Sequence, residues 1–296
     1  GLANYHNAFA AIYECRFLAG IAAGMKLNEM IENGTEINGV KVTAENAKIG
    51  YVGAFTYAEV VSGYTSFFLG ARSVCPSVTM KVQFVGSWSD ATEESNAASA
   101  LCDLGCKLIS QHSDNTTPAT MAQSKGAFHT GYNNDMTGVA PDASIIGCRI
   151  DWTNYFVYAI ESVANGQEFD QDYCYGYAHG DVVLTELNEK IAAPGTAEKL
   201  AEVEAGLADG SIKVFDTSTF TVGGETVTIQ NLEVVKVDPE LNMLVVRGAI
   251  PGPKYSLVTV KNTVKVHKAK QAGAGISSNP QKASGRNPQK ASARTK

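Results

Sequence analysis

The chain has 296 residues, of which 44% are hydrophobic and 18% charged, and its formal net charge is −6. This length suits one large domain or two ordinary ones, and the apolar content excludes a chain that is disordered throughout. No apolar run approaches the length of a membrane span, so the composition predicts no transmembrane helix.

The charge changes sign along the chain. Residues 1–228 hold 12 Lys/Arg and 27 Asp/Glu, whereas residues 229–296 hold 12 Lys/Arg and 3 Asp/Glu. Such asymmetry is typical of two segments with different partners. All six cysteines lie in the acidic part and none forms a CxxC pair, which favours free, mostly buried thiols over a disulfide or metal framework.

Strand and helix patterns alternate through the acidic part. An apolar stripe predicts a helix over Asn4–Lys26, and two Asn-Gly pairs predict turns or a hairpin within Asn33–Thr43. The later strands are predicted at 48–54, 79–85, 107–110, 127–132, 144–148 and 180–184, and the helices at 57–74, 90–104, 117–125, 155–165 and 197–208. This alternation indicates an α/β fold with a mainly parallel, doubly wound sheet.

After Gly210 the pattern changes to short β segments. A hairpin is predicted over 214–228 around Gly223-Gly224, and further strands are predicted at 232–237, 244–247 and 257–266. The residues from Lys268 onward lack periodicity and contain NPQKAS twice, which predicts a disordered basic tail. The chain is therefore expected to comprise domains at 1–226, 227–267 and 268–296.

The predicted site is organised around residues 107–136. Strand, helix and strand here make one βαβ unit, so the turns after both strands are expected at the carboxyl edge of a parallel sheet. Open α/β folds bind their ligands at that edge. Asp114 lies in the first of these turns, and Asp135 lies in the second.

Further aromatic and polar residues follow the predicted strands at the same edge. Rings stack on a planar ligand, and carboxylates and amides hydrogen-bond to its hydroxyl or amine groups. For each residue alone there is a simpler alternative to ligand binding. Each aromatic side chain could be packed at the edge of the sheet, and each acid could cap a helix. The residues predicted to bind a small molecule are Phe55, Trp88, Asp114, Asn133, Asp135 and Trp152.

His112 lies beside Asp114 and invites an acid–base interpretation. No nucleophile elbow, phosphate-cradling loop or zinc-ligand spacing accompanies it. Because an enzyme needs a convergent set of such groups, we expect no catalysis, no metal and no cofactor. A hydrogen-bonded loop histidine is an equally good interpretation of His112.

Eight sequence blocks then occur in an order that points to a family. They are CRFLAGIAAGMK, KIGYVGAFTYAEV, FFLGARSVCP, GSWSD, QHSDN, GYNNDM, DWTNYF and HGDVVLT. With them, residues 5–226 resemble the basic membrane protein family of ABC-transporter substrate-binding lipoproteins, which includes purine-nucleoside receptors. The resemblance implies a type I periplasmic-binding fold, a purine nucleoside or nucleobase as ligand, an ABC permease as partner and the extracytoplasmic face of the cell membrane.

Two features qualify this resemblance. The family's N-terminal section, with its signal peptide, lipobox cysteine and glycine-rich ligand motif, is not matched, so mostly one lobe is expected and the cytoplasm is an alternative location. An incomplete cleft and an exposed apolar face near helix 5–24 are expected as a result. Nucleoside receptors also present a lysine near the strand before Trp152, where this sequence has Arg149, so the ligand's identity stays open.

The basic part resembles a second family. The run TVTIQNLEVVKVDPELNMLVVRGAIPGPKYSLVTVKNTVK, within residues 226–270, looks like the C-terminal part of bacterial large-subunit ribosomal protein L-three. This implies ribosomal RNA as a partner, with a solvated basic tail as the alternative. The two resemblances meet near 226–230, which predicts a natural fusion, an engineered chimera or a spurious join. The implied phosphate contacts are Lys236, Arg247, Lys254, Lys261 and Lys265.

Overall fold

The computed structural model describes residues 5–168 and 170–216, together with the strand residues 221–222, 225–226, 233–238 and 243–247. The chain divides into two compact units, Gly1–Asp216 and Thr217–Lys296. None of the helices in the described part of the chain has the length and apolar character needed to cross a membrane.

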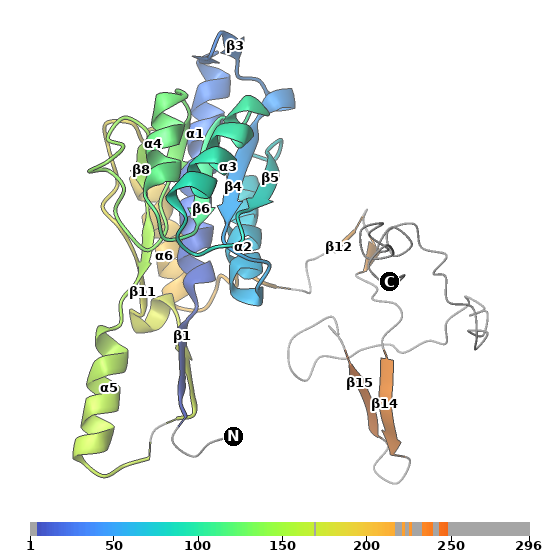
Figure 1. The fold of residues 1–296 in the computed structure, drawn as a ribbon, viewed down its shortest axis with the longest axis vertical. Coiled ribbons are helices and arrows are strands. Elements are labelled where there is room, and N and C mark those ends of the chain that lie inside the picture. Colours follow the sequence, from blue (N-terminus) through green and yellow to red (C-terminus); the bar gives the residue numbers. More distant parts are fainter. Residues whose placement is uncertain are drawn as a thin grey trace, which may run out of the picture. The chain divides into compact units, whose positions relative to one another are not determined.

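A five-stranded parallel sheet forms the centre of the first unit (Figure 1). Its spatial order is β5-β4-β6-β7-β8, so the order of the strands reverses between β4 and β6. Open parallel sheets bind ligands at the carboxyl side of such a switch point. The strands are β4 (Lys48–Gly53), β5 (Thr79–Phe84), β6 (Leu108–His112), β7 (Phe128–Thr130) and β8 (Ser144–Ile146).

Helices cover both faces of this sheet (Figure 1). One face carries α1 (Ile12–Glu32), α2 (Ala58–Val74) and α6 (Thr196–Ala208), and the other carries α3 (Ala91–Asp103) and α4 (Thr117–Ser124). Successive strand residues point to opposite faces, so Leu108 joins the core beneath α1 while Ile109 joins the core beneath α3. The doubly wound fold predicted from the alternating elements is confirmed.

The start of the chain corrects one prediction. Asn7–Ala10 is a strand, β1, and the first helix begins only at Ile12 and continues to Glu32. β1 pairs in parallel with β10 (Asp172–Tyr175), and the local sequence pattern could not predict this pairing because the two strands are far apart in the sequence. In α1, 13 of 21 residues are buried, so α1 lacks the apolar exposed face expected there.

A smaller layer lies beyond the carboxyl end of the sheet, at the bottom of Figure 1. The predicted strand at 144–148 is split, because β9 (Cys148–Ile150) follows β8 and pairs antiparallel with β11 (Val182–Leu184). Between β9 and β11 the chain forms α5 (Thr153–Ala164) and β10, followed by the 3₁₀ turn η2 (Tyr177–His179). One stripe of α5 is apolar and exposed: Phe156 (58%), Val157 (49%), Ile160 (67%) and Val163 (69%).

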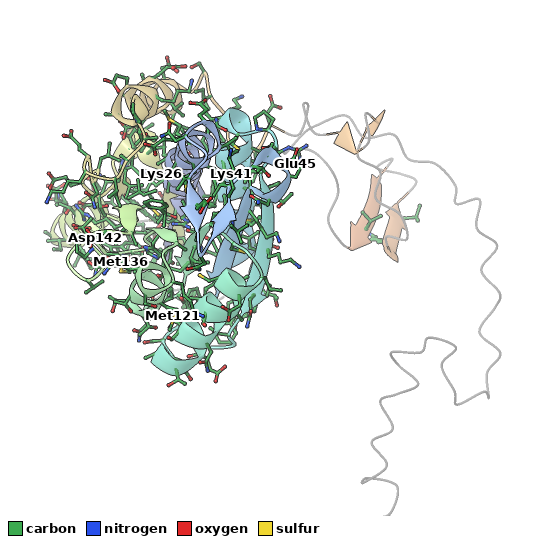
Figure 2. The ribbon with its side chains drawn as sticks, turned by 90° about the horizontal axis from the view of Figure 1, so that it is seen from above. Lys26, Lys41, Glu45, Met121, Met136 and Asp142 are labelled. Carbon is green, nitrogen blue, oxygen red and sulfur yellow. The ribbon has the colours of Figure 1, made fainter. Side chains whose placement is uncertain are left out.

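The opposite, amino end of the sheet carries a hairpin between α1 and β4. Its strands are β2 (Glu36–Ile37) and β3 (Val40–Lys41), and the 3₁₀ turn η1 (Ala44–Asn46) follows. Asn38 and Gly39 have positive φ angles of 52° and 73°, which is the two-residue turn that Asn-Gly favours, so the predicted hairpin is confirmed. Figure 2 views the unit from this end, where Lys26, Lys41, Glu45 and Asp142 lie.

The described part of the second unit consists of two hairpins. β12 (Thr221–Val222) pairs with β13 (Glu225–Thr226), and β14 (Glu233–Asp238) pairs with β15 (Met243–Arg247), both antiparallel. They match the hairpin and the two strands predicted there. The strand predicted at 257–266 and the predicted tail at 268–296 lie outside the described residues.

Candidate ligand-binding site

The loops that follow β4, β5 and β6 meet at the switch point of the sheet. Phe55 lies two residues after β4, Trp88 four residues after β5 and Asp114 two residues after β6. The main-chain N–H of Asp114 donates to the Trp88 carbonyl oxygen at 2.7 Å, which ties the loops after β5 and β6 together. Three of the six predicted ligand residues therefore lie at this point.

Aromatic rings form a cluster here. Phe55 stacks on Tyr57 with ring centroids 4.9 Å apart and an interplanar angle of 20°, and Trp88 meets Phe55 edge-on at 6.1 Å. Trp88 also lies 6.3 Å from the ring of His112, which packs on Tyr132 at 4.0 Å. His112 and Tyr132 are buried, whereas Phe55 and Trp88 are half-buried and Tyr57 is exposed, so the outer rings present a surface for stacking.

A carboxylate that the sequence did not single out lies within this aromatic cluster. Glu59 is in the first turn of α2, and its Oε1 lies 2.6 Å from His112 Nε2 and accepts from the Tyr132 hydroxyl at 3.4 Å. His112 Nδ1 lies 3.2 Å from the hydroxyl of Tyr51. An acid in the first turn of a helix is common because it complements the helix dipole, so only the tertiary contact with His112 distinguishes Glu59.

Burial sets the protonation of this pair. The His112 side chain is fully buried, while 23% of the Glu59 side chain is exposed. Burial lowers the pKa of His112 below its ordinary 6.5, although Glu59 opposes the shift. The imidazole is therefore neutral near pH 7, and we assign its Nε2–H as donor to Glu59 and its Nδ1 as acceptor from Tyr51.

Asp114 places a second carboxylate beside Glu59. Partial burial raises the pKa of Asp114, and the negative charge of Glu59 raises it further. Its turn is held by the buried Glu94 carboxylate, which accepts from the Ser113 hydroxyl at 2.6 Å and from the Asn115 N–H at 3.2 Å. In the described chain α4 has no side-chain cap, so helix capping does not explain Asp114.

The loop after β7 holds two more predicted residues. Asn133 has a positive φ of 55°, and its N–H donates to the Cys148 carbonyl oxygen at 2.6 Å. Asp135 Oδ1 accepts from the N–H of Thr137 at 2.9 Å, which is a local turn contact. Both predicted residues are exposed at the carboxyl edge, but no contact between described residues joins them to the aromatic cluster.

Trp152 belongs to the smaller layer. It immediately precedes α5, and its ring lies 6.0 Å from the ring of Tyr155. Among the described residues, no ring contact links Trp152 to the cluster around Phe55. Its role in binding stays a prediction.

The carboxyl edge of the sheet is acidic. Asp90, Asp114 and Asp135 lie in its loops, and Glu59 lies just behind them. Arg149, in β9, pairs with Asp151 at 3.3 Å. Among the described residues, no group of three or more His, Cys, Asp or Glu could hold a metal ion. This edge suits a neutral ligand rich in hydrogen-bond donors better than a phosphate.

The predicted RNA contacts belong to the second unit. Lys236 lies on β14 with an exposed side chain. Arg247 ends β15, where its backbone pairs with that of Glu233. Lys254, Lys261 and Lys265 lie outside the described residues.

Solved structures share the fold of the first unit. An ABC transporter solute-binding protein from Aeropyrum pernix superposes with a TM-score of 0.57 at 16% identity, covering 69% of this chain and 65% of that one. At this identity the match shows the fold alone. The predicted periplasmic-binding-type α/β fold is confirmed by this match.

The C-terminal part is similar to a different protein. The large ribosomal subunit protein uL3 of Geobacillus kaustophilus is 53% identical over 58 residues, which cover 19% of this chain and 27% of the ribosomal protein. The match supports the predicted fusion of two unrelated segments.

The acidic part has relatives with different named ligands. A purine-binding protein of Brucella abortus is 32% identical over 245 residues, and a protein of Haloferax volcanii described as an ABC transporter glucose-binding protein is 32% identical over 217. These alignments cover 78% and 73% of this chain but only 64% and 51% of the relatives. The family described as PnrA-like ABC transporter substrate-binding proteins matches residues 4–212, and the chain belongs to this family.

Proposed function

We propose that the first unit binds a purine nucleoside or nucleobase for an ABC import system. The observation that carries this proposal is that the Phe55, Tyr57 and Trp88 rings meet at the switch point of the sheet, where the loop that contains Asp114 is hydrogen-bonded to the Trp88 loop. A purine is flat enough to stack on the rings, and its amine, N–H or ribose hydroxyl groups can donate to the acids.

The named ligands of the two relatives define the alternative. One is named for a purine and the other for glucose, so the ligand class must come from the site. The exposed and half-buried rings support a base, whereas the acidic edge opposes a nucleotide because its phosphate would meet Glu59 and Asp114. Membership of the family further supports an ABC permease as partner and the outer face of the membrane as location.

Isothermal titration of the full chain with adenosine, guanosine, inosine and adenine tests the proposal. Glucose and AMP serve as comparison ligands. We expect at least one purine to bind, and AMP to bind at least about tenfold more weakly than the matching nucleoside. Binding of glucose alone, or of no purine, would overturn the purine proposal.

Variants test whether the aromatic cluster is the site. Trp88→Ala should weaken purine binding about tenfold, because a base–aromatic stack contributes about 1–3 kcal/mol. Phe156→Ala is the matched control, since this exposed ring lies on α5 outside the cluster. Equal affinities of the two variants would place the ligand elsewhere.

We propose RNA binding as a second function, supported by the similarity of the C-terminal part to uL3. Its basic residues, including Lys236 and Arg247, would contact phosphates. Binding of ribosomal RNA to the full chain should weaken steeply with added salt and disappear when residues 229–296 are removed. Binding that survives this deletion would contradict the assignment.

A further inference from the structure

We propose that Glu59 is a specificity-determining residue, whose Oε2 atom accepts a hydrogen bond from a donor group of the ligand. This role rests on the ligand site proposed above. Within that site, Glu59 is the group that distinguishes ligands by their hydrogen-bond donors. The ligand class it selects is a neutral, flat molecule that carries an N–H, amine or hydroxyl donor at its edge.

The two carboxylate oxygens of Glu59 differ in their hydrogen bonds, and this difference supports the role. Oε1 is occupied by His112 Nε2 and by the Tyr132 hydroxyl. Oε2 accepts a hydrogen bond from none of the described residues, and 23% of the side chain remains open to solvent. Two donors on Oε1 hold the side chain in one orientation, so Oε2 is a fixed acceptor rather than a mobile one.

The surroundings of Glu59 also favour a donor from outside. His112 is neutral, none of the described lysines or arginines forms an ion pair with Glu59, and the one carboxylic acid whose pKa Glu59 raises nearby is Asp114. The carboxylate therefore lacks a cationic partner, and a ligand that stacks on Trp88 or Phe55 would strip water from it. A stacked ligand without a donor would leave Oε2 without a hydrogen bond. A site with such an acceptor therefore binds that ligand much more weakly than one that carries the donor.

A purely structural role would give a different result. If Glu59 served only to hold His112, its replacement would weaken every ligand by the same factor. If Oε2 accepts a hydrogen bond from the ligand, the loss of affinity depends on which donor groups the ligand carries. The informative quantity is therefore the ratio of affinities for two ligands that differ by one donor.

Glu59→Gln makes this test. The amide oxygen can still accept from His112, while the –NH₂ group replaces the acceptor at Oε2 by a donor. Affinities are measured by titration calorimetry for adenosine against purine riboside, guanosine against inosine, and adenosine against 2′-deoxyadenosine and 3′-deoxyadenosine. We expect the unmodified protein to favour the donor-bearing member of at least one pair by about tenfold or more, and Glu59→Gln to bring that ratio near one.

Two further variants make the result interpretable. Glu45→Gln makes the same chemical change at the amino end of the sheet (Figure 2) and should leave every ratio unchanged. Glu59→Asp keeps the charge but moves the carboxylate oxygen away from the ligand, so it should also reduce the ratio of affinities. It replaces Glu59→Gln in the test if that variant fails to fold. Melting of each unliganded variant checks folding.

The outcomes separate the two proposals. Purine binding with ratios that Glu59→Gln leaves intact overturns the role of Glu59 but not the purine proposal. If glucose binds and purines do not, the purine proposal fails, and so does the proposal that Glu59 selects a flat ligand. If the protein binds none of these ligands, both proposals are overturned.

Discussion

At the scale of single residues, the unusual feature is a charged side chain that is fully buried beneath the carboxyl edge of the sheet. Arg16 is fully buried, donates to the Gly131 carbonyl oxygen at 2.7 Å and to the Ser110 hydroxyl, and lies over the rings of Tyr51 and Phe67. A buried guanidinium is tolerated when hydrogen bonds and ring faces replace its water. These contacts offset the cost of burying the Arg16 guanidinium behind the site.

His129 makes stability depend on pH. Its buried imidazole contacts Gln111 and Ser144, and burial lowers its pKa to about 3. The unfolded chain takes up a proton below about pH 6.5, whereas the folded chain does not until about pH 3, so stability falls as the pH drops below 6.5. From about pH 7 to about pH 5 this residue alone should cost about 2 kcal/mol, and His112 acts in the same direction.

Urea unfolding at the two pH values checks this expectation. His129→Gln should remove about 2 kcal/mol of the pH-dependent loss, whatever its stability at neutral pH. His6→Gln, a change at a half-buried histidine near the start of the chain, should retain the full loss. Equal pH dependence in the unmodified protein and His129→Gln would contradict the assignment.

At the scale of elements, short sequence patterns correctly predicted features that are made by residues close together in the chain. Asp90 was expected to cap a helix, and its side chain accepts from the N–H groups of Thr92 and Glu93 at 3.1 and 3.0 Å. The βαβ unit at 107–136 was also predicted, and β6 and β7 pair in parallel as expected. Each of these features depends on residues that are neighbours in the sequence.

Features made by distant residues could not be predicted in this way. β1 and β10 are four residues each and are separated by more than 150 positions, so no local pattern marks their pairing. Glu59 was missed because its partner His112 is 53 residues away. The sequence did place Phe55, Trp88 and Asp114 at one edge, because each follows a strand of the same parallel sheet, whose carboxyl ends share that edge.

The helices α1 and α2 cross in very close contact. A methyl group on Gly20 would overlap the carbonyl oxygen of Phe67, and one on Gly70 would overlap that of Phe17. The two backbones therefore touch, which only glycine allows. Gly20→Ala should destabilise the protein by about 3 kcal/mol, the upper end for an overpacked core, although alanine is the better helix former.

Denaturant unfolding measures this cost. Gly138→Ala is the control, because a methyl group there meets no atom within 4 Å. Its effect should stay within about 0.5 kcal/mol. A stabilising Gly20→Ala change would show that the helices do not cross at this distance.

At the scale of the whole first unit, the smaller layer is thinly covered. β1 and β10 form a two-stranded parallel sheet, and parallel sheets normally occur with both faces covered. Phe9 and Tyr175 on these strands are exposed. The apolar stripe of α5 is exposed as well, so these exposed apolar residues lie on α5, β1 and β10 and not on α1, where the sequence led us to expect them.

This apolar surface should make the chain self-associate. Exposed contiguous apolar patches favour contacts between molecules, and Ile160 and Val163 lie one turn apart on the stripe. We expect the mass measured by light scattering to rise with concentration, and the double variant Ile160→Lys/Val163→Lys to remain at the mass of one chain. Leu104→Lys, at an exposed leucine after α3, should behave like the unmodified protein. A monomeric unmodified protein at its highest soluble concentration would contradict the expectation.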